Sequence, residues 1–357
     1  MALARYAQTD VGVSYPPHYR SILEALEMAG CSITLVRSPS RMFVFRELGK
    51  SLLLVSPRAA LDLAKARPDL ILVLEYNMGL LWALLAARLT GAKLYVFQEN
   101  AGYAGYALGG VRRAVRRRLA SLIDGFLANT TAAADEIERT LSVDPVRVIQ
   151  APLLYPPARE EMLRRPFELA DPTMRPLFLF VGRLDARKNV HTLLQASSIL
   201  AQRGLDFSVW IVGDGPLRQQ HLRTTRDLRL EDRVRFLPWI PSESLGFIYE
   251  KSDVFVMPSV RDYRSVSVLE AMRFGKPVLD SRSDGNAGDS VREAITGFLF
   301  DPRQPSELAQ HMVSFVREPQ LAARMGERAN EMMNREYAPE VAADRLRREL
   351  VDPWRIA

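Results

Sequence analysis

The sequence has little cysteine and little histidine, and these shortages exclude several kinds of protein. The only cysteine, Cys31, cannot form an internal disulfide, which indicates a reducing compartment. One cysteine cannot supply the ligands of a zinc cluster, and the four histidines show no spacing typical of metal ligands: His18, His191, His221 and His311. A metal centre built on these side chains is therefore not expected.

Long uninterrupted apolar runs are also missing. The first residues lack a basic segment followed by a long apolar stretch, so no secretory signal is predicted and a cytoplasmic protein is expected. Residues 70–89 come nearest to membrane length, but Glu75 and Asn77 interrupt them, which favours a strand, a turn and a helix. No transmembrane span is predicted.

Lysine is scarce among the basic residues. Lys and Arg together number 48 against 42 Asp and Glu, a net charge of +6, and only six of the 48 are lysine. A mild positive balance suits anionic partners in general, including nucleotides, acidic membrane surfaces and nucleic acid. Because the arginines are dispersed and no nucleic-acid-binding module is recognisable, binding to nucleic acid is not expected.

What the sequence does contain is a repeated alternation of short apolar runs with segments of helical period. Its 357 residues suffice for two domains, and the alternation predicts an α/β class in which helices cover parallel sheets. Six prolines between residues 151 and 176 indicate a linker, because proline interrupts regular elements. We predict domains at 1–160 and 177–338, a linker at 161–176 and a final helix within 339–357.

Twelve strands are predicted from the apolar runs. They lie near residues 2–6, 32–36, 70–74, 93–97, 125–128, 146–150, 177–181, 207–212, 234–237, 254–257, 277–279 and 297–300. In doubly wound sheets ligands bind at the carboxyl ends of the strands, so a cleft between the two domains is the expected site.

Two turns that follow predicted strands of the second half carry candidate ligand-binding groups. The first contains Arg183, Arg187 and Lys188 and precedes a predicted helix, whose free N–H groups attract anions. A diphosphate would fit there, although a solvated loop with ordinary surface charges fits equally well. The second turn contains Gly213 and Gly215, whose backbone angles are less restricted than those of other residues. Alone, such a turn is more often structural.

A third segment runs from Pro258 through a polar loop into an apolar helix. Ser265 is the predicted N-cap of that helix, directly before Val266. Asp262 and Glu270 place two carboxylates around a helix start that is able to hold an anion. Taken alone, Asp262 would be a loop carboxylate, and Glu270 would be solvated or would cap a neighbour.

Together these segments resemble glycosyltransferase family 4. The resemblance is strong from residue 177 to 301 and depends on four stretches: Phe180 to Leu184 with Lys188-Asn189, Gly213 to Pro216, Asp253 to Ser259, and Glu270 to Met272 with Gly275 and Pro277. It implies the GT-B fold, two Rossmann-like domains facing across a cleft, with residues 1–160 on the acceptor side and 177–338 binding a nucleotide sugar. The final helix would cross back to the first domain.

The resemblance also implies an activity and site residues. The expected enzyme is a retaining glycosyltransferase that moves a sugar from a nucleotide-diphosphate donor to a glycan or lipid-linked saccharide in surface polysaccharide biosynthesis. No metal or other cofactor is required, because Arg183 and Lys188 would clamp the diphosphate. Asp262 would lie near the sugar, which makes these three the expected catalytic residues. Glu270 would bind the ribose, and the other expected donor-binding residues are Gly213, Ser265, Val266 and Trp239. Trp239 would stack on the base or be a buried structural tryptophan.

Fewer signals mark the acceptor side in the first half. Gly12 follows the first predicted strand, and Glu99 and Asn100 stand where many relatives of that family place a histidine near the sugar. Glu99 would be an acid or base near the acceptor, or an ordinary loop carboxylate. The predicted helix at 111–123 carries five arginines against an apolar face, which indicates peripheral contact with an anionic membrane or a solvated surface helix.

One departure from the family pattern leaves alternatives open. Where the family commonly has Glu-Gly-Phe-Gly, this chain has Asp262-Tyr263-Arg264-Ser265, which shortens the acid and adds bulk where glycines let the backbone approach the donor. A catalytically weak nucleotide-sugar-binding protein is therefore an alternative. A nucleotide-sugar epimerase of the same architecture is another, although no His–carboxylate pair is visible in the second half.

Overall fold

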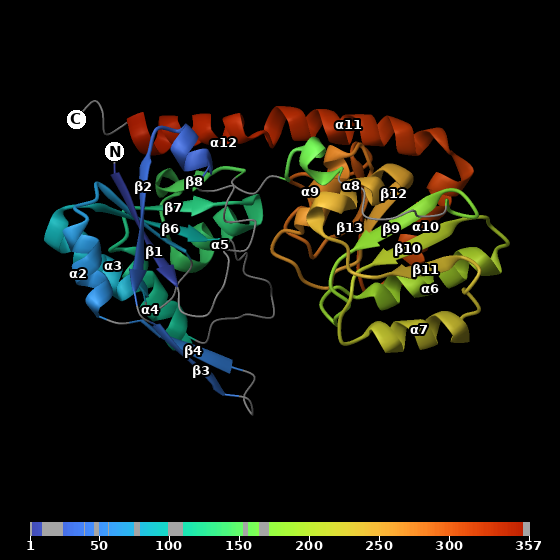
Figure 1. Ribbon diagram of the computed structural model, residues 1–357, viewed down its shortest axis with the longest axis horizontal. Coiled ribbons are helices and arrows are strands. Elements are labelled where there is room, and N and C mark those ends of the chain that lie inside the picture. Colours follow the sequence, from blue (N-terminus) through green and yellow to red (C-terminus); the bar gives the residue numbers. More distant parts are fainter. Residues whose placement is uncertain are drawn as a thin grey trace. The chain divides into compact units, whose positions relative to one another are not determined.

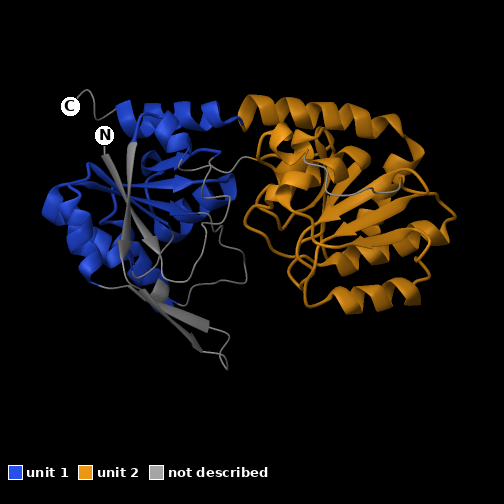
Figure 2. Cartoon of the chain, viewed as in Figure 1, with its two compact units in different colours: residues 1–154, 338–357 blue, residues 155–337 orange. Residues whose placement is uncertain are grey.

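The computed structural model describes residues 2–8, 24–38, 40–45, 50–55, 57–74, 79–98, 110–152, 156–163 and 171–352. The chain forms two compact units, residues 1–154 with 338–357, and residues 155–337 (Figure 2). Each unit is built around a six-stranded parallel sheet that alternates with helices (Figure 1). Both are Rossmann-like α/β domains, as the alternation of apolar runs and helical segments predicted.

The first unit contains a sheet with the strand order β2-β1-β5-β6-β7-β8. The strands are β1 (Ala2–Gln8), β2 (Ser32–Ser38), β5 (Leu70–Leu74), β6 (Lys93–Gln98), β7 (Gly125–Ala128) and β8 (Val148–Gln150). The connections from β5 through β8 all advance in the same direction across the sheet. Because such crossovers are right-handed, their helices cover one face of it.

The helices of that layer are α2 (Arg58–Lys65), α3 (Gly79–Thr90), α4 (Gly110–Ala120) and α5 (Thr131–Leu141). Thr130 caps α5, since its hydroxyl accepts a hydrogen bond from the backbone N–H of Ala133 at 3.0 Å. The strands that they cover, β5 and β7, are buried almost throughout, as expected of a parallel sheet with both faces covered.

A hairpin between β2 and α2 was not predicted. Its strands β3 (Ser40–Phe45) and β4 (Lys50–Val55) pair antiparallel as a separate two-stranded sheet. The strands of the two six-stranded sheets all lie close to their predicted positions.

The second unit contains a sheet with the order β11-β10-β9-β12-β13-β14. Its strands are β9 (Leu177–Val181), β10 (Ser208–Val212), β11 (Val234–Leu237), β12 (Val254–Met257), β13 (Val278–Ser281) and β14 (Gly297–Phe300). One layer of helices contains α6 (Val190–Gln202), α7 (Arg218–Asp227) and α10 (Pro305–Arg317), of which α6 packs on both others. The remaining helices are α8 (Ser242–Lys251), α9 (Val266–Arg273) and α11 (Gln320–Glu336), and α11 packs on α9.

The division between the units differs from the predicted boundaries. It falls at residue 154, and the predicted linker at 161–176 belongs to the second unit. The start of the predicted linker joins the second unit because a 3-10 helix (Arg159–Met162) places Met162 in the core of that unit, with no exposed surface. Helix α12 (Pro339–Leu346) and the π-helical turn Arg347–Val351 belong to the first unit. Among the described residues, no helix is both long enough and apolar enough to cross a membrane.

Candidate functional site

A pocket of about 750 Å³ lies at the carboxyl ends of strands β9, β10 and β11 in the second unit. The register places Val181 beside Val212, so the turns that follow these two strands begin at the same level of the sheet. Three predicted donor residues line this pocket, namely Arg183, Gly213 and Trp239. The other lining residues are Val181, Gly182, Val212, Asp214, Gly215, Ile240 and Leu245.

The two turns approach each other more closely than side chains would permit. Gly213 has a φ of +137°, and a Cβ atom on it would lie 2.0 Å from the carbonyl oxygen of Gly182. A Cβ atom on Gly215 would lie 2.5 Å from the carbonyl oxygen of Leu184. The floor of the pocket therefore consists of backbone, and only glycine fits at these positions.

Trp239 is 69% exposed and lies at the wall of the pocket. This exposure excludes the buried structural tryptophan that the sequence left as an alternative. An indole ring beside a backbone-lined floor provides an apolar face on which a planar ring can stack.

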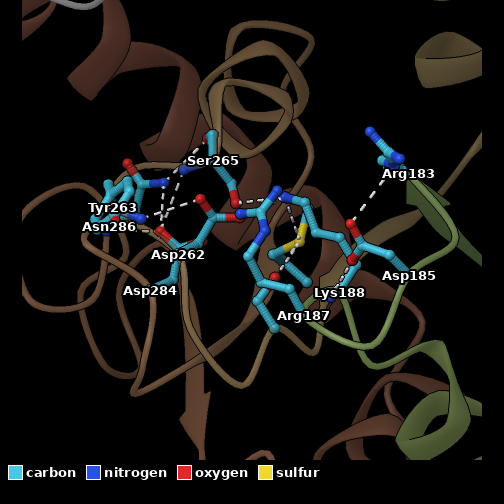
Figure 3. A network of polar contacts seen from close by, with 11 residues as sticks. Arg183, Asp185, Arg187, Lys188, Asp262, Tyr263, Ser265, Asp284 and Asn286 are labelled. Carbon is cyan, nitrogen blue, oxygen red and sulfur yellow. Dashed lines mark hydrogen bonds and ion pairs between the residues drawn. The ribbon is translucent and has the colours of Figure 1, made fainter. Parts of the chain in front are cut away.

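Lys188 and Asp262 form a buried ion pair (Figure 3). The Lys188 Nζ atom lies 2.6 Å from Asp262 Oδ2 and donates a second hydrogen bond to Ser265 Oγ at 3.1 Å, and its side chain is only 9% exposed. Arg187 NH1 contacts the same carboxylate oxygen at 2.6 Å. Ser265 occupies the predicted N-cap position of α9, but its side chain makes no capping bond, and its hydroxyl accepts the hydrogen bond from Lys188 instead. Val266 is the first residue of that helix.

The charges around Asp262 determine its protonation. Burial alone would raise the pKa of this carboxyl, but Lys188 and Arg187 outweigh burial and hold the pKa below its usual value. Arg183 lies apart from this pair: its side chain is 70% exposed, and its Nε atom is 3.7 Å from Asp185 Oδ2 (Figure 3). The structure thus brings Lys188 and Asp262 together and leaves Arg183 at the pocket.

A second loop, residues 283–290, holds the segment that carries Asp262. The Asp262 N–H donates to the carbonyl of Ser283 at 3.1 Å, and the Gly285 N–H donates to the carbonyl of Asp262 at 3.1 Å. Asp284 Oδ1 accepts from the side-chain amide of Asn286 at 2.8 Å, and that amide also donates to the Ser265 carbonyl at 3.0 Å. Sequence analysis did not identify Asp284 as a site residue, because nothing in its position along the chain shows that this loop reaches α9.

Two further carboxyls of this region are buried. Asp280, in β13, is completely inaccessible, and neither of its carboxyl oxygens has a hydrogen-bond partner. It stands beside Met257 in the sheet register, and Lys188 Nζ lies 3.6 Å from the Met257 sulfur. Burial and the neighbouring Asp284 raise the pKa of Asp280 well above its usual value, and burial and Asp262 raise that of Asp284. No group of three or more metal-binding side chains occurs among the residues that the structure describes.

Glu270 is buried inside α9 rather than solvated. Its Oε2 atom accepts a hydrogen bond from the hydroxyl of Tyr249 in α8 at 2.7 Å. Burial raises the pKa of Glu270, and the hydrogen bond from Tyr249 opposes this rise. Tyr249, which sequence analysis did not select, therefore fixes the orientation of this carboxyl.

The predicted acceptor-side residues Gly12, Glu99 and Asn100 lie outside the described residues. The predicted amphipathic helix is present as α4, and Val111 and Val115 are exposed on it.

Two family models match most of the chain. Residues 4–153 match the glycosyl transferase 4-like domain, and residues 163–332 match the glycosyl transferases group 1 domain. A 2-deoxystreptamine glucosyltransferase of Streptomyces kanamyceticus is 30% identical over 87% of this chain and 85% of its own length. An alpha-D-kanosaminyltransferase of the same organism is 28% identical over 66% of this chain, and the match spans 61% of that relative's length.

Solved structures share the fold. HepE of Anabaena in complex with UDP has a TM-score of 0.76 at 16% identity, and the match covers 98% of this chain and 99% of HepE. The apo form of the lipopolysaccharide outer core galactosyltransferase WaaB has a TM-score of 0.72 at 15% identity, covering 99% of this chain and 100% of WaaB. The chain is thus a glycosyltransferase with the GT-B fold, and it belongs to glycosyltransferase family 4.

Proposed function

We propose that this protein transfers a sugar from a nucleotide-diphosphate donor to a glycan or lipid-linked saccharide in surface polysaccharide biosynthesis, with retention of configuration and without a metal. The pocket at the ends of β9, β10 and β11 carries this proposal, because it combines a backbone-lined floor with a cation, Arg183, and an exposed indole, Trp239. A diphosphate suits the floor and the cation, and a base suits the indole.

The chemistry assigns a role to each charged group. Negative charge develops on the leaving diphosphate, and fixed cations in a site with little water stabilise it by several kcal/mol. Arg183 is already at the pocket, whereas Lys188 must exchange its contact with Asp262 for the phosphate. Asp262 would then be released toward the sugar. Glu270, held by Tyr249, would accept a hydrogen bond from the ribose.

The acceptor proposal draws on the relatives and on one helix. Relatives are named for 2-deoxystreptamine, for inositol 3-phosphate and for the lipopolysaccharide core. The proposed membrane contact through residues 111–123 favours a lipid-linked acceptor, and the exposure of Val111 and Val115 in α4 supports it.

The experiment first screens UDP-, GDP- and dTDP-sugars for thermal stabilisation, because a ligand that binds only the folded state raises the melting temperature. With the donor so found, transfer is measured for the wild type, R183A and K188A in the presence of EDTA, and NMR determines the anomeric configuration of the product. We expect each variant to lose at least about 100-fold in rate. Near wild-type transfer by both variants would refute the phosphate clamp.

A second candidate, the catalytically weak nucleotide-sugar-binding protein, is favoured by the observation that Lys188 and Asp262 neutralise each other. It predicts donor binding without product for every acceptor tested. An epimerase would instead convert the donor sugar when no acceptor is present.

A further inference from the structure

The helical layer of the first unit presents an unusual number of exposed aliphatic side chains. In α3, Leu81, Leu85 and Leu89 are between 43% and 64% exposed, and Leu61 in the neighbouring α2 is 59% exposed. Positions four residues apart lie above one another on one helix face, so the three leucines form a continuous row. Helices α2 and α3 pack side by side (Figure 1), which brings Leu61 onto the same layer.

Most of the charged residues around the row are cations, and the one acidic residue of α2, α3 and α4 is the half-buried Asp62 in α2. Arg88 is exposed on α3, and Arg58 and Lys65 are exposed on α2. Neither α3 nor α4 contains an acidic residue. Helix α4 covers the same face of the sheet and adds Val111, Val115, Arg113 and Arg117.

Exposure of this apolar surface to water is unfavourable unless a binding partner covers it. A second copy of the chain is disfavoured, because two identical faces would bring together many cations and only one acidic side chain each, Asp62. An anionic bilayer fits both the leucine row and the cations around it. It takes up aliphatic side chains at the level of the headgroups and attracts the surrounding arginines.

We propose that the outward face of α2, α3 and α4, centred on the leucine row of α3, docks on an anionic lipid bilayer. The docking deepens the proposed function, because it would bring the enzyme to the surface that holds a lipid-linked acceptor. It extends the contact beyond residues 111–123 to a row of leucines that the sequence analysis did not single out.

The test compares three full-length proteins in vesicle flotation. They are the wild type, the variant L81Q/L85Q/L89Q, and a control, V146Q/I295Q, which removes two exposed aliphatic side chains elsewhere on the chain. Vesicles contain either phosphatidylcholine alone or phosphatidylcholine with phosphatidylglycerol. We expect the wild type and the control to bind the anionic vesicles, more weakly at high salt, and the leucine variant to bind at least about tenfold less.

Binding of UDP, GDP and dTDP, measured by calorimetry, provides an independent readout. Unchanged hydrogen exchange in β5, β6 and β7 would show that the first unit of the leucine variant is folded. If none of the proteins bound UDP, GDP or dTDP, the proposed function would fail while the vesicle result kept its meaning. Equal vesicle binding by the leucine variant and the wild type would refute the docking proposal. So would equal binding to both kinds of vesicle, or a dimer that the leucine substitutions dissociate.

Discussion

At the scale of single residues, the pKa of each buried carboxyl in the site depends on the charges beside it. Lys188 and Arg187 hold the pKa of Asp262 below its usual value, whereas burial and a neighbouring carboxylate raise the pKa of Asp280 and of Asp284. The same type of side chain therefore contributes to stability with opposite dependence on pH, according to its neighbours.

The substitution Asp262→Asn should destabilise the protein by about 3 kcal/mol at neutral pH, because it leaves the buried Lys188 without its counter-charge. The folded-state pKa of Asp262 lies below its usual value, so the stability it contributes is present above that value and is lost as the pH falls through the folded pKa. Urea unfolding of both proteins between neutral and acid pH should show the difference shrinking toward acid pH. A difference independent of pH would contradict this assignment.

The substitution Asp280→Asn should have the opposite effect. Since the folded-state pKa of Asp280 is raised, this residue makes the protein less stable as the pH rises from its usual pKa to the folded one. The variant should therefore gain stability over the wild type at neutral pH and lose that gain in acid. A variant that is less stable than the wild type at neutral pH would show that Asp280 is ionised and paired.

At the scale of elements, the ends of β9 and β10 explain how a parallel sheet forms the backbone floor of the pocket. The strands are in register up to Val181 and Val212, and the next residue of each strand is glycine. Gly213 permits the close approach of the two turns, because a Cβ atom there would overlap the carbonyl oxygen of Gly182.

Gly213→Ala should cost about 3 kcal/mol, because a Cβ atom would overlap the carbonyl oxygen of Gly182 at a φ of +137°. Gly204→Ala is the matched control: its φ is +67° and nothing lies within 4 Å of the added atom, so only about 1 kcal/mol of backbone strain is expected. Denaturant unfolding measures both, and thermal stabilisation by the donor should be lost only in the Gly213 variant. Similar losses of stability in the two variants would mean that the turns do not depend on close contact.

At the scale of the whole molecule, two separate segments of the chain build the first unit. Residues 338–357 belong with residues 1–154 although the entire second unit lies between them in sequence. The Arg347 side chain donates to the carbonyl of Met28 at 2.9 Å, and Leu346, Leu350 and Val351 are buried. The C-terminal segment therefore contributes to the stability of the first unit.

Leu346→Ala should destabilise the first unit by about 2–5 kcal/mol, because the leucine is completely buried. Hydrogen exchange resolves the two units: exchange should become faster in the strands β5, β6 and β7 and remain unchanged in β9 and β12. Val341→Ala, at a position that is 36% exposed on the same helix, serves as the control. Faster exchange confined to the second unit would overturn this assignment.

The sequence by itself determined the class of the fold and the positions of both sheets' strands along the chain, because parallel strands are short apolar runs separated by helical periods. The resemblance to glycosyltransferase family 4 also implied Arg183, Gly213 and Trp239 as site residues, and these three line one pocket. It did not predict the hairpin of β3 and β4, and it placed the linker inside the second unit. Only the tertiary structure decided that Lys188 pairs with Asp262, that Tyr249 holds Glu270 and that Asp280 is buried without a partner. These contacts join residues far apart in the chain, and no local pattern of apolar and polar residues encodes which side chains meet.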